Sequence, residues 1–134
     1  MKRNALAIMV AAVLSSPLAF GADNMTRDQI KSENDRISAD FKAAKQACES
    51  RSGNAKDVCM AEAKGREKVA KAELDAKVKG TPKAQEALQV ARAEADFDVA
   101  KEKCDDLSGN SKDTCVADAR AKLKRAKADA EAKR

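Results

Sequence analysis

The chain contains no histidine, tryptophan or tyrosine, and only three of its 134 residues are phenylalanine. Without histidine it has neither the most frequent general base nor the most frequent metal ligand of proteins. Of the 113 residues that follow position 21, only 16 are Ile, Leu, Val, Met or Phe. So few large side chains cannot fill a sheet-based core or line a typical apolar ligand pocket. The sequence predicts a single small domain without a catalytic, cofactor or metal site.

Charged residues are abundant but nearly balanced, with 27 Lys and Arg against 22 Asp and Glu. The carboxylates lie among lysines, where ion pairing is the default. Ser52 and Ser108 have no histidine base to activate them, and they fit turns better than nucleophilic catalysis. We therefore expect that the protein is not an enzyme.

The N-terminal segment has the pattern of a cleavable export signal. Lys2 and Arg3 give it a positive start, residues 5–14 are apolar over too short a length to span a bilayer, and small residues precede a cleavage point after position 21 or 22. The alternative is an uncleaved anchor. We expect residues 1–21 to be a signal peptide and the rest of the chain to reach the bacterial periplasm, without a transmembrane segment after cleavage.

Residues 41–77 and 97–133 are two copies of one unit, offset by 56 positions without gaps. They share 18 identities in 37 positions. The segments CESRSGNAKDVC and CDDLSGNSKDTC keep two cysteines, a Ser-Gly-Asn turn and a Lys-Asp pair at identical spacings. The chain is therefore an internal duplication centred on a turn between two cysteines.

Each copy has the residues expected between two helices. A glycine adopts positive φ without steric cost and suits the end of the first helix. The asparagine that follows is expected to cap the second helix, and an aspartate three residues later would complete a capping box near the positive helix terminus. These residues are Gly53, Asn54 and Asp57 in the first copy and Gly109, Asn110 and Asp113 in the second.

Four cysteines in an exported chain predict two disulfides. Composition leaves three pairings open. Spacing favours Cys48–Cys59 and Cys104–Cys115, because each pair flanks its turn about equally and facing positions of an antiparallel hairpin lie close enough to bridge. Each would close a short loop worth about 3 kcal/mol in the chain-entropy model. The spacing is unlike a redox CxxC pair and histidine ligands are missing, so we expect a structural role.

Ala, Lys, Glu, Arg and Gln dominate the chain and favour helix throughout. Thr26 and Gln29 predict a capping box, Gly80 ends a helix, and Thr81-Pro82 starts the next with proline in its first turn. The expected fold class is all-α, made of duplicated disulfide-linked helical hairpins. Hairpin 1 spans 22–79 and hairpin 2 spans 80–134, with helices at about 26–52, 54–79, 82–108 and 110–134.

The packing of the hairpins is less determined. Phe41 and Phe97 lie at equivalent points of narrow apolar stripes, and we expect each to be the core plug of its hairpin. Segment 82–108 carries a net charge of −3 and segment 110–134 carries +4, which favours packing of these two helices on each other. Two arrangements stay open, an antiparallel four-helix bundle and two loosely packed hairpins.

A group of basic residues near the C-terminus is a candidate for contact with an anionic envelope surface. The group has no aromatic residues for base stacking, and export argues further against a nucleic-acid partner. It also has no bulky apolar face for insertion into lipid, so such contact would be peripheral. The residues are Arg120, Lys122, Lys124, Arg125 and Lys127.

Two resemblances bear on function. The runs AKGREKVAKAELDAK and ARAKLKRAKADAEAK, within residues 55–134, resemble in composition the long helical middle region of TolA-type envelope proteins. With its cysteine-linked duplication, the chain also resembles small uncharacterised exported Ala/Lys-rich helical proteins of proteobacteria. Met25-Thr26-Arg27-Asp28-Gln29 is similar to the LTxxQ motif of Spy and CpxP, which are helical periplasmic stress chaperones, with Met in place of Leu and in one copy only.

Together these patterns favour a non-enzymatic, exported helical protein of the cell envelope with a structural or interaction role and no cofactor. Its partner would be another protein or a second copy of itself. The alternative is a periplasmic chaperone or stress-binding protein of the Spy and CpxP kind.

Overall fold

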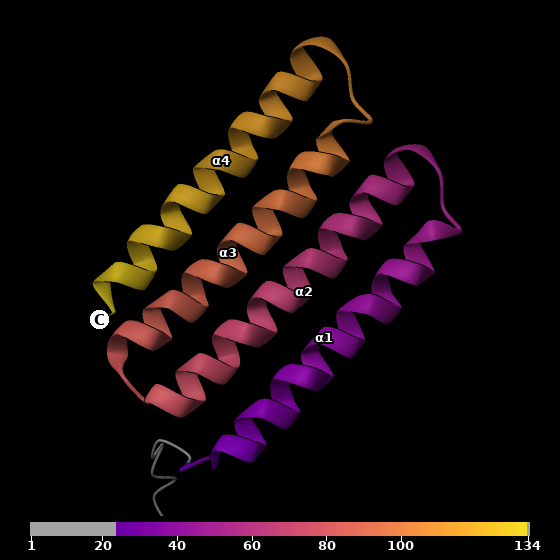
Figure 1. Ribbon diagram of the computed structural model, residues 1–134. Coiled ribbons are helices and arrows are strands. Elements are labelled where there is room, and N and C mark those ends of the chain that lie inside the picture. The colour runs from indigo at the N-terminus through magenta and orange to yellow at the C-terminus, as the bar shows by residue number, and fades with distance from the viewer. Residues whose placement is uncertain (1–23, 134) are drawn as a thin grey trace, which may run out of the picture.

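The computed structural model describes residues 24–133, so the predicted signal peptide lies outside the described residues. Four helices follow one another, α1 (Arg27–Glu49), α2 (Gly53–Lys79), α3 (Pro82–Cys104) and α4 (Gly109–Ala132) (Figure 1). Between residues 24 and 133 there is no β-strand. The predicted all-α fold of two helical hairpins is confirmed.

Two helices begin as the sequence predicts. At α1, Thr26 Oγ1 accepts a hydrogen bond from the Gln29 backbone N–H (3.2 Å), and Gln29 Oε1 accepts one from the Thr26 N–H (2.8 Å). This reciprocal pair is the predicted capping box. At α3, Thr81 Oγ1 accepts from the Ala84 N–H (3.2 Å), and Pro82 occupies the first turn. The segment that resembles the LTxxQ motif therefore serves as a helix cap.

The first helix of each hairpin is shorter than predicted. α1 ends at Glu49 rather than at 52, and α3 ends at Cys104 rather than at 108. A backbone hydrogen bond then closes a tight turn, from the Arg51 N–H to the Cys48 carbonyl (3.0 Å) and from the Leu107 N–H to the Cys104 carbonyl (3.0 Å). These residues leave the helix because reversing the chain between antiparallel helices takes more than one glycine.

Each turn glycine is the first residue of the second helix rather than the end of the first. Gly53 and Gly109 both have a φ of +55°, so the predicted positive φ is confirmed. The preceding serine occupies the N-cap position without a side-chain hydrogen bond. The N-cap prediction for the asparagines, and with it the capping box, is wrong, because the backbone already reverses at the glycine. The residues concerned are Asn54 and Asp57 in α2 and Asn110 and Asp113 in α4.

Both predicted disulfides are present. Cys48–Cys59 joins α1 to α2 and Cys104–Cys115 joins α3 to α4, with Cα–Cα distances of 5.6 and 5.7 Å. These distances are usual for disulfides. Cys48 and Cys104 have no exposed surface. Each disulfide fixes one end of its hairpin, and the other end depends on side-chain packing.

The four helices lie side by side in one open layer, each antiparallel to the next (Figure 1). α1 contacts α2, α2 contacts α3 and α3 contacts α4, and no other pair of the four described helices makes contact. The predicted packing of the third helix on the fourth is confirmed. α1 and α4 form the two edges, and no described element covers either face of the layer.

The most extensive contact, between α2 and α3, joins the two hairpins. At one point the backbones approach closely, because a Cβ atom added at Gly65 would lie 3.0 Å from the Ala95 Cβ. Small residues allow this approach, so the hairpins form one packed unit. The buried cluster at this interface consists of Ala76, Ala84 and Leu88, with Val69 and Ala72 packed against it.

Candidate functional site

Grooves run between neighbouring helices of the layer. One groove of about 160 Å³ lies between α1 and α2 and is lined by residues that include Phe41 and Ala63. Another of about 150 Å³ lies between α3 and α4 and is lined by residues that include Phe97 and Ala119. Every residue of the second groove lies 56 positions after a residue of the first. The duplication has therefore produced two equivalent grooves.

A third groove connects these two. It has a volume of about 450 Å³, lies between α2 and α3, and shares Arg66 with the first groove and Asp96 and Ala100 with the second. A fourth, of about 530 Å³, extends the first groove toward the start of α1 and shares Arg36 and Ile37 with it. The four grooves make one continuous surface across all four helices, which we term the grooved face.

The two phenylalanines lie in the groove walls and are only partly buried. The prediction that each plugs the core of its hairpin is wrong, because neither ring is among the buried core residues. In hairpin 1 the buried places are taken by side chains such as Ile37 and Leu74. Lys45 Nζ lies 5.4 Å from the centroid of the Phe41 ring, within the range of a cation–π contact. Both rings therefore offer apolar contact area on the grooved face.

Four exposed side chains of alternating sign cross the grooved face, one from each helix, and we term them the charge row. Neighbours in the row line a common groove. The first member, an aspartate, forms an ion pair with Arg36 of its own helix (2.9 Å). Within residues 24–133, the other three have no ion-pair partner. The members are Asp40 on α1, Arg66 on α2, Asp96 on α3 and Lys122 on α4.

A different set of charges ties three helices together. Glu94 of α3 accepts hydrogen bonds from Lys127 of α4 (2.7 Å) and from Lys68 of α2 (3.2 Å). The bond from Lys127, with a smaller effect from Lys68, holds the pKa of the Glu94 carboxyl below its ordinary value although partial burial opposes the shift. Glu94 lies two residues before Asp96, which places it about 200° around α3. This ion-pair cluster therefore lies on the face opposite the grooves.

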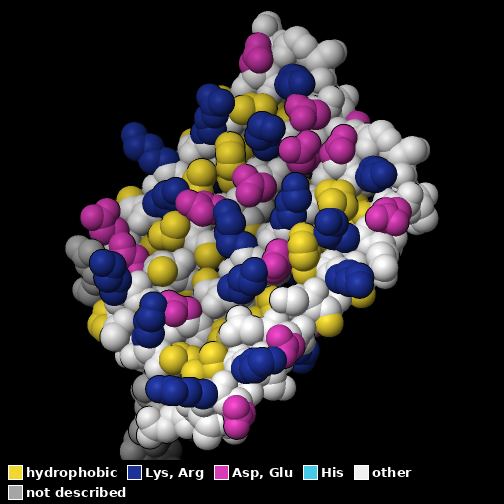
Figure 2. Space-filling view, viewed as in Figure 1, with side chains coloured by type: hydrophobic (Ala, Val, Ile, Leu, Met, Phe, Trp, Pro, Cys, Tyr) yellow, Lys and Arg dark blue, Asp and Glu magenta, His cyan; other side chains and the backbone are white. Residues whose placement is uncertain are grey.

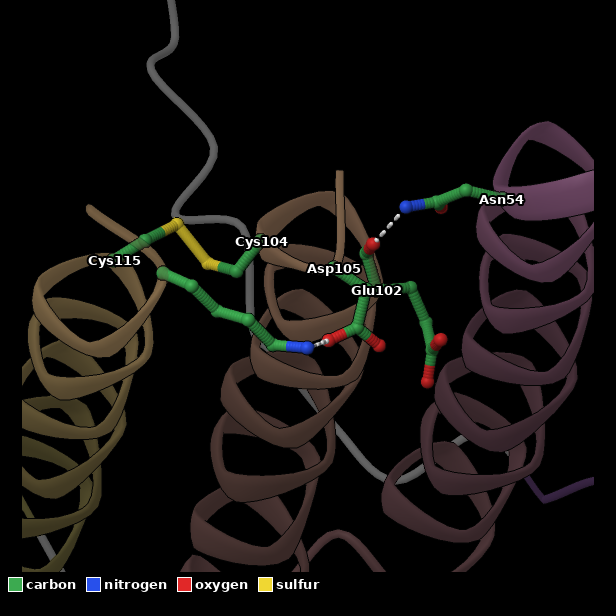
Figure 3. Close-up of a disulfide and its surroundings, with 6 residues drawn as sticks. Asn54, Glu102, Cys104, Asp105 and Cys115 are labelled. Atoms are coloured by element: carbon green, nitrogen blue, oxygen red, sulfur yellow. Dashed lines mark hydrogen bonds and ion pairs between the residues drawn. A yellow bond between two sulfur atoms is a disulfide. The ribbon is translucent and has the colours of Figure 1, made fainter. Parts of the chain in front are cut away.

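The junction of the hairpins carries further polar contacts near the second disulfide (Figure 3). Asn54 Nδ2 donates a hydrogen bond to the Glu102 carbonyl (2.8 Å), which links the start of α2 to the end of α3. Its Oδ1 is buried and has no partner among the described residues. Across the second turn, the hydrogen bond from Lys112 (2.9 Å) lowers the pKa of Asp105. Asn110, the counterpart of Asn54, is exposed, so this link exists only between the hairpins.

The basic residues predicted to contact an anionic surface do not share one face. Lys127 pairs with Glu94, whereas Lys122 belongs to the charge row on the opposite face. Figure 2 shows acidic and basic side chains interspersed over one face of the layer, with hydrophobic side chains between them. Contact with an anionic envelope surface therefore stays a prediction, and the basic residues of α4 do not form a concentrated patch that would support it. All five lie exposed on α4, namely Arg120, Lys122, Lys124, Arg125 and Lys127.

Sequence reasoning found the turns and disulfides but missed the grooved face. Its signal was present, because charges of the same sign recur at the 56-residue offset, as in Asp40 and Asp96. Which charges line one groove depends, however, on how the helices pack. In the described part of the chain, no group of three or more His, Cys, Asp or Glu side chains is placed to hold a metal ion. None of the four helices combines the length and the apolar character needed to span a bilayer.

The chain matches no protein-family model, no curated protein and no solved structure. What it does is therefore inferred from its own residues.

Proposed function

We propose that this protein is a non-enzymatic, exported component of the bacterial cell envelope that binds other proteins in the periplasm through its grooved face. The two equivalent grooves support this function most directly, because each sets a half-buried phenylalanine beside charges of both signs. Aromatic anchors with a polar surround are typical of protein interfaces. The two disulfides fit an oxidising compartment.

Site-specific photo-crosslinking in cells tests the proposal. A photoreactive amino acid replaces Ala126, which lines the groove between α3 and α4. The matched control carries it at Ala117, an exposed alanine of the same helix that lies five residues before Lys122 and so about 140° away around α4. We expect protein adducts from position 126 and none from position 117. Adducts from neither position, or equally from both, would contradict the proposal.

Cell fractionation of the same cultures tests export. We expect the processed chain in the periplasmic fraction, with all four cysteines protected from alkylation until a reductant is added. Recovery of the chain in the cytoplasm with free thiols would remove the envelope part of the proposal.

A chaperone of the Spy and CpxP kind is a second candidate. The open grooved face favours it, since short apolar contacts beside charges of both signs would hold unfolded chains weakly. Light scattering of an aggregating client protein provides the test. We expect a stoichiometric amount of the protein to suppress aggregation, and replacement of Phe41 and Phe97 by serine to abolish the effect. No suppression by the unmodified protein would eliminate this candidate.

A further inference from the structure

We infer that the grooved face binds the grooved face of a second copy of this chain, related by a two-fold axis parallel to the helices. The inference goes beyond the proposed function, because it assigns to the same face a second copy of this chain rather than another protein. The order of signs in the charge row leads to it, because the row reads negative, positive, negative, positive from α1 to α4. The four side chains are Asp40, Arg66, Asp96 and Lys122.

Rotation by 180° about an axis parallel to the helices reverses the order of the four helices across the layer. It leaves the height of each residue along the helix direction unchanged. α1 then faces α4 of the second copy, and α2 faces α3. At the level of the row, Asp40 faces Lys122 of the second copy and Arg66 faces Asp96 of the second copy. Each pairing occurs twice, as an isologous interface requires. All eight charges of the two rows therefore meet a charge of opposite sign.

The alternative two-fold axis, perpendicular to the helices within the plane of the interface, is disfavoured. It keeps the order of the helices, so α1 faces α1 and α3 faces α3. Asp96 would then face Asp96 of the second copy, and Arg66 would face its own equivalent. Like charges placed opposite one another in an interface are strongly unfavourable. The charge row thus selects one relative orientation of the two layers.

The size of the face suits a stable dimer. Helices of 23 to 27 residues are about 35–40 Å long, and four of them at a spacing of about 10 Å make a layer about 40 Å wide. Such a face exceeds the roughly 800 Å² per partner that a standard interface buries. The Phe41 and Phe97 rings, half-buried in each copy, would lose their remaining exposure in the dimer.

Sedimentation equilibrium of the chain with intact disulfides tests the inference. We expect self-association, and we expect Arg66→Glu and Asp96→Arg each to weaken it by about tenfold or more. An equimolar mixture of these two variants should regain the affinity of the unmodified protein, because both central pairs of the mixed dimer again join opposite charges. Lys64→Glu is the matched control: it makes the same charge change on the side of α2 that carries the Lys68–Glu94 ion pair, and it should leave association unchanged.

Several outcomes overturn the inference. Association that neither variant weakens, or a mixture that binds no better than either variant alone, would do so. A chain that stays monomeric while position 126 captures other proteins would overturn self-association and leave the proposed function standing. A dimer that the variants weaken, with no adducts to other proteins, supports the inference and removes the binding of other proteins. Circular dichroism checks that each variant is folded. If a central variant unfolds, the mixing test is repeated with Asp40→Arg and Lys122→Glu, which change the outer pair of the charge row.

Discussion

Hairpin 1 and hairpin 2 share a turn, a disulfide and a groove, yet their first helices are held in different ways. Among the described residues, α1 contacts only α2, and each ion pair of α1 lies within that helix. α3 lies between α2 and α4 and pairs its charges with both. Two copies of one sequence unit therefore act as an edge and as a centre. Some positions of the repeat are buried in both hairpins, as Cys48 and Cys104 are, whereas burial at other positions depends on the place of the helix in the layer.

Side chains at equivalent positions of α1 and α3 differ in polarity and burial, in keeping with the edge position of α1 and the central position of α3. Ahead of the two repeat copies, α3 buries apolar residues where α1 exposes polar ones 56 positions earlier. Because this side of α1 is polar and exposed, another helix could not pack against it as closely as α2 packs against α3. The pairs, written with the α1 residue first, are Asp28 and Ala84, Ser32 and Leu88, and Asp35 and Ala91.

The largest contrast should come from removing one disulfide at a time. Replacing Cys48 and Cys59 by serine costs about 3 kcal/mol in the chain-entropy model and leaves α1 with packing against α2 alone. The same change at Cys104 and Cys115 leaves α4 with the Lys127–Glu94 ion pair. Amide hydrogen exchange should therefore show α1 opening fully in the first variant and α4 opening less in the second. Equal loss of protection in the two helices would show that the Lys127–Glu94 ion pair does not hold α4 more firmly than α1 is held.

The contact between α2 and α3 provides the second contrast. Gly65→Leu places a large side chain where even a Cβ lies 3.0 Å from the Ala95 Cβ, so it should destabilise the fold by about 1–3 kcal/mol. Ala121→Leu, at the equivalent point on the exposed outer side of α4, should change stability by no more than about 0.5 kcal/mol. Urea denaturation of both variants measures the difference. Similar midpoints would mean that α2 and α3 do not meet as closely as described.

The two turn asparagines give a smaller effect. Asn54→Ala removes the hydrogen bond to the Glu102 carbonyl and should cost about 1 kcal/mol, because the bond links the two hairpins in a partly buried place. Asn110→Ala, on an exposed residue, should be nearly neutral. Thermal unfolding of the two variants side by side tests this order, and a larger loss from Asn110 would reverse our assignment of centre and edge.

The smallest effect concerns pH. The pKa of Glu94 is lowered by Lys127 and Lys68, so its ionised form stabilises the fold above the ordinary carboxyl pKa, and this contribution is lost as pH falls through the lowered value. About a third of the side chain is exposed (34%), and solvent screening limits the contribution to a few tenths of a kcal/mol, at most about 1. Glu94→Gln should therefore destabilise at neutral pH and become neutral in acid. Ser38, the counterpart in α1, has no such carboxylate, so Ser38→Ala should show no pH dependence.

Local spacing allowed the caps at Thr26 and Thr81 and both disulfides to be predicted, because each depends on a few consecutive residues. The open layer could not be predicted in the same way. α2 and α3 each pack against two neighbours, so their apolar residues are divided between two sides and mark no single face. Alanines such as Ala76 and Ala84 form much of the contact, and their small size makes a buried position hard to tell from an exposed one.

The outer side of α4 bears on how such a layer grows. Ala121 and Arg125 stand where α2 has Gly65 and Val69, the residues that admit and contact α3. In stacked repeat arrays, terminal units with a polar outer side keep the array soluble and finite. A further hairpin fused in tandem would thus find its docking position obstructed by two side chains. Ala121→Gly with Arg125→Val is the shortest route to an extensible scaffold, whose width would be set by the number of copies joined.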